Sequence, residues 1–307
     1  MYYLALTVIV LLLSILWFFP VAIYRILLRL FVLLSPFQQK SVTLENGQHC
    51  VYIEKGNAEK TKKTILLLHG FSATYIGYLK VGKKFDSSYH VIAIDWLNHG
   101  SSAKVERLVK LDEAVNFVRM FVKKVGLTGR KLHVVGHSTG GYIAVHYAIK
   151  YPQECASVSM LAPLGVLIAE KLDIDKFCSP KNKEEVNNLI DFVSNGKLSL
   201  LPSYFMYAAR LLRCSMAESH LQVYHGFIKN AKFTADDMRK LSNIPSILIW
   251  GDTDKLLPTQ VGIEFFKENS PTTEIHILKD AGHAIIDTDA DEVYRLLQSW
   301  FERNSTI

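Results

Sequence analysis

The stretch GHSTGG at residues 136–141 decides the fold of this 307-residue chain. It follows an apolar run at 132–135 and leads into a helical pattern at 142–151. Gly-x-Ser-x-Gly between a strand and a helix is typical of a nucleophile elbow, a tight turn that lifts the Ser138 hydroxyl out of the sheet. The N–H groups at the start of the helix then point at the reacting oxygen. The alternative, a glycine-rich turn with an incidental serine, is disfavoured by this position between strand and helix.

Length and composition allow one large domain with an insertion, or two small domains. Apolar residues make up 49% of the chain, which supplies a sizeable core and excludes a disordered protein. The net charge of +6 is spread thinly, so nothing supports binding to nucleic acid. The four cysteines show neither CxxC pairs nor zinc-ligand spacing, which favours free thiols in a reducing compartment: Cys50, Cys155, Cys178 and Cys214.

The first 24 residues carry no charged side chain. Residues 2–19 would span about 27 Å as a helix, close to the ~30 Å hydrocarbon core of a bilayer. They lack the basic start and small-residue cleavage site of a signal peptide. We therefore expect residues 1–24 to be a retained transmembrane anchor, which Pro20 kinks or ends.

Residues 25–44 form the expected juxtamembrane amphipathic segment. Its helical pattern, which runs over 21–34, places Arg25 and Arg29 on one face among leucines and isoleucines. This predicts either an interfacial helix or the tail of a tilted span with snorkelling arginines. Because the first charges are positive and follow the span, the positive-inside rule places the catalytic domain on the cytoplasmic side.

Short apolar runs alternate with helical patterns over residues 45–307, which favours a parallel sheet covered on both faces. The strand-like runs fall at 50–54, 64–68, 90–95, 131–135, 157–161, 246–250 and 274–278, and the helical patterns at 111–125, 142–151, 259–267 and 291–303.

An insertion at about 167–243 interrupts this alternation with helical patterns at 183–194 and 203–216. We expect it to be a helical cap over the carboxyl ends of the strands. Six apolar residues of the insertion have two possible roles, which are to face an apolar substrate or to pack against other helices. They are Tyr204, Phe205, Met206, Tyr207, Leu211 and Leu212.

Two side chains downstream complete a catalytic set with Ser138. A serine hydroxyl needs a base to take its proton, and the base needs a carboxylate to hold it. Asp254 and His283 each follow a predicted strand, and ligands bind outside the carboxyl ends of strands in open α/β sheets. The order Ser138, Asp254, His283 is also that of the hydrolase fold with this elbow.

On these motifs, together with HGFS at 69–72 and WGDTD at 250–254, residues 45–303 resemble an α/β-hydrolase-fold serine hydrolase. The similarity is greatest to the membrane-anchored monoacylglycerol lipase (ABHD-six-like) branch. It implies a mostly parallel sheet with helices on both faces and a helical cap. The family pattern Gly-x-x-Asp-x-x-x-Pro falls on 251–258 and selects Asp254 as the triad acid, leaving Asp252 as a turn or cap carboxylate.

An oxyanion hole needs two N–H donors where negative charge develops. One is expected to be the amide of Thr139, directly after the nucleophile, and the resemblance assigns the other to the amide of Phe71. His69 is expected to shape that loop rather than react, and His137 to be a packing or specificity residue rather than a second base.

Two stretches depart from the family pattern. Asn98 replaces a glycine in the turn after the 90–95 strand, and asparagine tolerates left-handed conformations, so we expect the turn to survive. The usual Glu and Pro are missing from residues 284–289, which leaves the docking of the last helix open.

The sequence thus predicts a membrane-tethered serine esterase that needs no cofactor and no metal. Its expected substrate is a lipid-like carboxylic ester, with a monoacylglycerol as the leading candidate. Alternatives with the same triad are a small-ester carboxylesterase, a thioesterase or a carbon–carbon hydrolase. A non-catalytic membrane-bound interaction module is the alternative from another class. The serine at the elbow disfavours epoxide hydrolases and dehalogenases, which resemble this fold but place an aspartate there.

Overall fold

The computed structural model describes residues 3, 14, 17–61, 63–168, 172–198 and 203–304. Within these ranges, no helix combines the length and the apolar character that a membrane span requires. The anchor predicted at 1–24 lies mostly outside the described residues.

An eight-stranded sheet forms the centre of the molecule, in the order β1-β2-β4-β3-β5-β6-β7-β8. β2 runs antiparallel to both β1 and β4, and all other neighbours are parallel. The mostly parallel sheet predicted from sequence is therefore confirmed. The strands are β1 Gln38–Thr43, β2 His49–Lys55, β3 Lys63–Leu68, β4 Tyr89–Ile94, β5 Leu132–His137, β6 Cys155–Leu161, β7 Ser246–Gly251 and β8 Glu274–Leu278.

Strand β1 was not predicted, and its burial explains why. It lies at the edge of the sheet, pairs only with β2, and its residues are almost all exposed. Its sequence, QQKSVT, therefore carries no buried apolar run to identify it.

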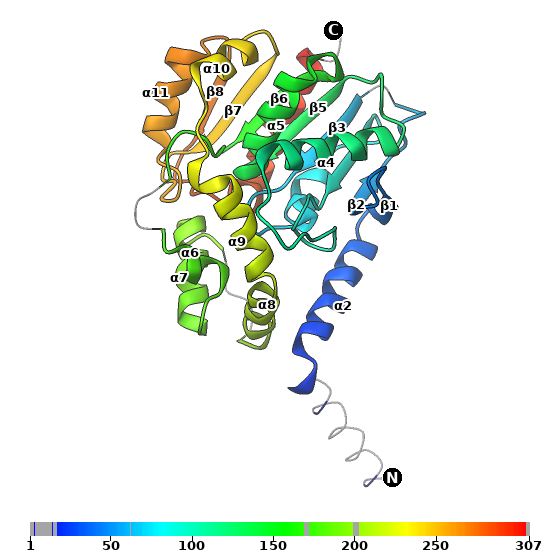
Figure 1. The fold of residues 1–307 in the computed structure, drawn as a ribbon, viewed down its shortest axis with the longest axis vertical. Helices are drawn as coiled ribbons and strands as arrows, with labels where there is room; N and C mark the ends of the chain where they lie inside the picture. The colour runs from blue at the N-terminus through cyan, green and yellow to red at the C-terminus, as the bar shows by residue number, and fades with distance from the viewer. Residues whose placement is uncertain are drawn as a thin grey trace.

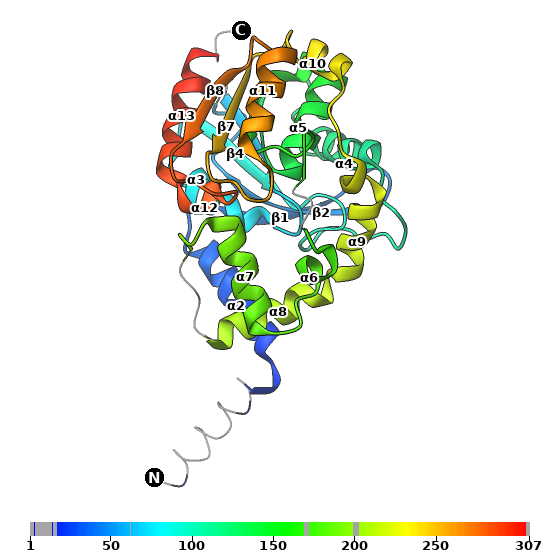
Figure 2. The same ribbon diagram turned by 90° about the vertical axis from the view of Figure 1, so that its left-hand side faces the viewer.

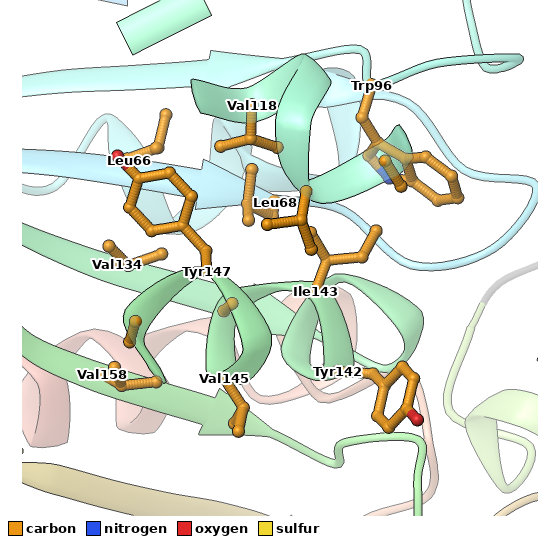
Figure 3. Packing of buried hydrophobic residues seen from close by; sticks show 14 of the residues in the cluster. Leu66, Leu68, Trp96, Val118, Val134, Tyr142, Ile143, Val145, Tyr147 and Val158 are labelled. Carbon is orange, nitrogen blue, oxygen red and sulfur yellow. The ribbon is translucent and has the colours of Figure 1, made fainter. Parts of the chain in front are cut away.

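Helices cover both faces of the sheet (Figure 1). One face carries α4 Leu111–Lys124, α5 Thr139–Lys150, α10 Ala235–Leu241 and α11 Thr259–Asn269. The other carries α3 Leu79–Gly82, α12 Ile285–Thr288 and α13 Ala290–Arg303. Figure 3 shows how the first layer packs, with Ile143 and Tyr147 of α5 beside Leu68 of β3. Short 3₁₀ turns lie at Tyr75–Tyr78, Pro152–Glu154 and Ile228–Asn230.

Four helices form the cap at one end of the sheet (Figure 2): α6 Ile174–Cys178, α7 Lys183–Ser194, α8 Ser203–Ser215 and α9 Ala217–Gly226. Helix α10, which the sequence placed in the same insertion, packs instead on α5 and α11. Helix α2, Pro20–Leu33, begins at Pro20 and packs against α8 and β1. Helix α2 therefore lies beside the cap and also contacts the edge of the sheet (Figure 1).

The two stretches that depart from the family pattern are both ordered. Asn98 adopts φ 64°, the left-handed conformation expected of it. After His283 the chain forms α12 and then α13, whose buried side chains, Trp300 and Phe301 among them, dock it on the sheet. All four cysteines are free thiols, as predicted.

Candidate active site

Ser138 occupies the turn between β5 and α5 with φ 54° and ψ −120°. This is a strained conformation for a residue with a side chain. A Cβ on Gly136 would lie 2.1 Å from the carbonyl oxygen of Gly140, and a Cβ on Gly140 would lie 2.0 Å from the carbonyl oxygen of Leu68. Both glycines are therefore required by close backbone contacts, as the elbow geometry demands.

Asp254 and His283 meet beyond the ends of β7 and β8. The His283 Nδ1 lies 2.7 Å from Asp254 Oδ2, and both side chains are buried. The same carboxylate accepts hydrogen bonds from the indole Nε1 of Trp250 at 3.0 Å and from the amides of Leu256 and Leu257 at 2.9 Å. The hydrogen bonds orient the carboxylate toward the imidazole.

The charge state of Asp254 follows from these contacts. Burial by itself would raise its pKa. The positive charge and hydrogen bond of His283, with further donors from Leu257 and Trp250, outweigh burial and hold the pKa below its ordinary value. Asp254 is thus an anion at neutral pH. Asp252, two residues earlier, is exposed, and its position on the surface fits the turn carboxylate expected there.

The sequence analysis did not identify Trp250 as a support for the acid. Its indole N–H is the kind of buried donor that needs a partner. Trp250 lies four residues before Asp254, at the end of a buried strand. This position could have identified it from the sequence as a hydrogen-bond donor to the acid.

His137 holds the backbone of His283. Its Nε2 lies 2.8 Å from the carbonyl oxygen of His283, and because a carbonyl only accepts, this nitrogen carries the proton. Burial, followed by the nearby charge of His283, lowers the pKa of His137 to about 3, so its ring stays neutral. These contacts describe a packing and positioning residue.

The amides expected to bind an oxyanion belong to Phe71, after β3, and Thr139, the first residue of α5. The Phe71 amide donates no hydrogen bond to another described residue. The Thr139 amide is among the N–H groups that a helix leaves free at its start. His69 lies in the same loop, with Nδ1 bonded to the Gly70 carbonyl at 2.8 Å, and burial lowers its pKa to about 4. Its contacts fit the structural role expected of it.

These groups line a cavity of about 240 Å³, which we call the inner cavity. Ser138, Thr139, Phe71 and His283 all contribute to its wall. The remaining wall is largely aliphatic and aromatic. Its cap residues include Phe177 of α6, three residues of α7, Arg213 of α8 and Tyr224 of α9; those of α7 are Leu189, Ile190 and Val193.

The apolar cap residues singled out from the sequence lie elsewhere. Met206 is buried, Tyr207 is 48% exposed, and neither lines the inner cavity. Leu212 lines a different cavity. Helix periodicity identifies an apolar face, but only the packing of the cap decides which face looks toward Ser138.

A second cavity of about 420 Å³, the outer cavity, lies between α2, α7, α8, the start of α9 and the loop after β3. It shares five lining residues with the inner cavity, which we call the junction: Ser72, Ala73, Leu189, Ile190 and Arg213. Across the described ranges, no group of three or more His, Cys, Asp or Glu side chains is placed to hold a metal ion.

Comparison with known proteins identifies the family of the chain. Residues 65–296 match the model of the alpha/beta hydrolase family. Lipase 3 of Moraxella sp. is 28% identical over 84% of this chain and 84% of its own length. A monoacylglycerol lipase of Xenopus laevis is 24% identical over 81% and 77% of the two chains. The crystal structure of a membrane phospholipase A superposes with a TM-score of 0.84 over the whole of both chains at 23% identity, a likeness of fold.

Proposed function

The chain belongs to the alpha/beta hydrolase family and is a carboxylic ester hydrolase, and we propose that Ser138, His283 and Asp254 are its catalytic triad. We propose further that its substrates are lipid-like esters, with monoacylglycerols as the leading candidates. The observation that carries the proposal is the shared cavity: the His283 imidazole, oriented by Asp254 at 2.7 Å, lines the same apolar space as Ser138.

The chemistry follows from the position of each group. His283 Nδ1 is bonded to Asp254, which leaves Nε2 to take the proton as the Ser138 oxygen attacks the ester carbonyl. The oxyanion that forms is bound by the amides of Phe71 and Thr139. The protonated His283 then gives its proton to the departing alcohol. Water, deprotonated by the same imidazole, releases the carboxylic acid and restores Ser138.

Two observations support a lipid-like acyl group. The cap and body enclose the inner cavity with apolar side chains, which favour an alkyl chain over a polar acyl group. Relatives over most of the chain are named as lipases, including the monoacylglycerol lipase of Xenopus laevis.

The nucleophile is tested by labelling with a fluorophosphonate probe and by hydrolysis of 1-oleoylglycerol. We expect Ser138→Ala to lose labelling and at least about 10³-fold in kcat, with its thermal unfolding unchanged. Ser88→Ala, in an exposed turn, is the matched control and retains both. Equal labelling of wild type and Ser138→Ala would refute the assignment of the nucleophile.

We also propose that α2 contacts a membrane, following a retained anchor at 1–24 and with the catalytic domain on the cytoplasmic side. The outward side of α2 is apolar: Ile26, Leu27, Leu30 and Phe31 are between 40% and 56% exposed. Its arginines, Arg25 and Arg29, instead line the outer cavity. An exposed apolar face of this kind is typical of a helix that lies in the membrane interface.

This proposal is tested with an ester lipid embedded in vesicles. The double change Leu30→Glu and Phe31→Glu should lower hydrolysis of the embedded lipid about tenfold, a loss equivalent to ~1.4 kcal/mol, and leave a soluble short-chain ester unaffected. Leu108→Glu introduces a charge at an apolar residue of similar exposure, 55%, away from α2 and should lower neither rate. An equal fall in both rates would show damage to the fold rather than a membrane contact. Alkali-resistant attachment of the full chain to vesicles tests the anchor.

A further inference from the structure

Four arginines line the outer cavity, and one of them also reaches the inner cavity. Arg25 and Arg29 come from α2, and Arg210 and Arg213 come from α8. Of these four, Arg213 lies at the junction and lines both cavities. A charged side chain of the cap therefore borders the chamber in which Ser138 is proposed to react.

The loop after β3 forms a tight turn over residues 70–73, which we call the oxyanion turn. The Ala73 amide donates to the Gly70 carbonyl at 3.2 Å, so Phe71 and Ser72 occupy the two central positions of the turn. Ser72 adopts φ 56°, a left-handed conformation that favours glycine. A serine in this conformation is strained, and it persists only where neighbouring groups hold it. The direction of the Phe71 N–H thus depends on what holds Ser72.

Arg213 holds the hydroxyl of Ser72. Its Nη2 donates to Ser72 Oγ at 2.9 Å, and its Nε donates to the Phe177 carbonyl of α6. Burial lowers the pKa of Arg213 to about 10, so the guanidinium is still charged at neutral pH and both hydrogen bonds are charge-assisted. The rigid fork of guanidinium donors lets one side chain make both bonds at once. Arg213 therefore ties the strained turn to the cap.

The cap also holds the ring of Phe71, through aromatic contacts. The ring stacks on Phe177 of α6, with the centroids 5.8 Å apart and 12° between the planes. It packs against His220 of α9 in an edge contact at 5.6 Å. The Arg213 guanidinium in turn lies 4.5 Å from the centre of the Phe177 ring. Aromatic packing and hydrogen bonding thus join the same two parts of the molecule, the oxyanion turn and the cap.

We propose that Arg213 is a positioning residue for the oxyanion hole: its hydrogen bond to Ser72 stabilises the oxyanion turn in the conformation that directs the Phe71 amide at the developing negative charge. This rests on the proposed function and adds to it a role for the cap in catalysis. A donor displaced from its position stabilises the transition state less, while the apolar cavity still binds the substrate. Changes at Arg213 therefore lower kcat and leave KM nearly unchanged.

The first test measures hydrolysis of p-nitrophenyl butyrate, an uncharged ester, so that a loss cannot come from attraction between Arg213 and a charged headgroup. Arg213→Gln should lower kcat at least about tenfold with little change in KM, since removal of a whole oxyanion donor costs about 10²- to 10³-fold. The matched control is Arg210→Gln. Arg210 lies on the same helix and donates to the Lys181 carbonyl at 2.9 Å, a contact within the cap. This variant should keep kcat within about twofold of the wild-type value.

Two substitutions of Ser72 give the decisive comparison. Ser72→Ala removes the hydroxyl and keeps the strain, whereas Ser72→Gly removes the hydroxyl and the strain together. Ser72→Ala should lose about as much kcat as Arg213→Gln, and Ser72→Gly at most about threefold. In the Ser72→Gly background, Arg213→Gln should cost no more than about a further twofold, because the turn no longer needs Arg213. If Arg213 served only the stability of the cap, it would cost the same in both backgrounds.

A trifluoromethyl ketone reports on the oxyanion hole directly. The Ser138 oxygen adds to its carbonyl carbon, the π electrons of the carbonyl move to the oxygen, and the hydroxyl proton passes to His283. The adduct therefore carries the negative oxygen that the Phe71 amide is proposed to bind. The inhibition constant of the ketone should rise in Arg213→Gln by about the factor by which kcat falls.

Thermal unfolding checks that Arg213→Gln is folded. Should it fail to fold, Ser72→Ala and Ser72→Gly decide the question, and equal kcat in these two variants overturns the inference. A kcat of folded Arg213→Gln within about twofold of the wild-type value, or a loss that Ser72→Gly does not relieve, overturns this inference alone while Ser138 is still labelled by the fluorophosphonate. No ester hydrolysis and no fluorophosphonate labelling of the wild type overturns the proposed function.

Discussion

The outer cavity borders on one buried carboxylate, Asp95, and a second, Asp254, lies behind the His283 imidazole that lines the inner cavity. The two carboxylates are held in opposite ways. Asp254 receives hydrogen bonds from His283, Trp250 and two backbone amides, and its pKa lies below the ordinary value. Asp95 receives two backbone amides, and burial raises its pKa to about 6. Burial is similar for both, so the cationic partner and the additional donors decide which carboxylate has the lower pKa.

The charge of Asp254 matters for the proposed reaction. A charged Asp254 stabilises the imidazolium that forms when His283 takes a proton. With a pKa of about 6, Asp95 is mostly ionised at neutral pH and supplies one negative charge beside the four arginines of the outer cavity.

The largest expected effect concerns the acid of the inner cavity. Asp254→Asn should lower kcat for 1-oleoylglycerol about 10³- to 10⁴-fold, because the amide neither stabilises the imidazolium nor enforces the reactive tautomer of His283. Steady-state kinetics measure the loss. Asp252→Asn, the exposed neighbour, is the control and should retain full activity. A comparable loss in Asp252→Asn would mean that the wrong aspartate has been chosen.

The next effect tests the elbow that defines one wall of the inner cavity. Gly140→Ala should reduce the free energy of unfolding by about 4 kcal/mol, because its Cβ would lie 2.0 Å from the Leu68 carbonyl oxygen. Chemical denaturation gives the value. Gly47→Ala is the matched control: its φ of +82° is also positive, but no atom lies within 4 Å of the added carbon. It should cost only about 1 kcal/mol, and similar losses in both variants would contradict the steric argument.

The smallest effect concerns the carboxylate of the outer cavity. Its folded pKa of about 6 exceeds the unfolded value near ~3.9, so between these pH values the folded protein binds more protons than the unfolded chain. Stability from this group is therefore present at low pH and is lost as the pH rises through 6. Over the whole titration, the contribution of Asp95 to the free energy of unfolding falls by roughly 3 kcal/mol.

Urea unfolding of wild type and Asp95→Asn between pH 4 and pH 7 measures this contribution. Over this range the neighbouring Lys104, whose pKa is about 8, stays charged, and His69, whose pKa is about 4, is mostly neutral. The wild-type free energy of unfolding should fall by roughly 2 kcal/mol relative to that of the variant over this range, because the unfolded group is already about half ionised at pH 4. Parallel curves would show that Asp95 is already charged in the folded protein at pH 4.

Local patterns predicted much of the body of the molecule. Strands β5 and β7, which lead to Ser138 and Asp254, were recognised because each is a short apolar run, which a central strand buried on both faces requires. Strand β8, which leads to His283, lies at the edge of the sheet and is only partly buried. The left-handed conformation of Asn98 was expected from sequence, because asparagine tolerates it better than most residues. Its further bond to Gln222 of α9, 124 positions away, did not, because no local pattern encodes a contact between distant segments.

The sequence by itself determined the elbow, the order of the three catalytic candidates and the alternation of strands and helices. All of these depend on backbone geometry and on the spacing of residues near one another in the chain. Only the tertiary structure decided which side of α2 faces outward, which cap residues line the inner cavity, and that four arginines meet around one space. Those outcomes depend on how separate helices pack, because packing brings together side chains whose separation along the chain carries no signal.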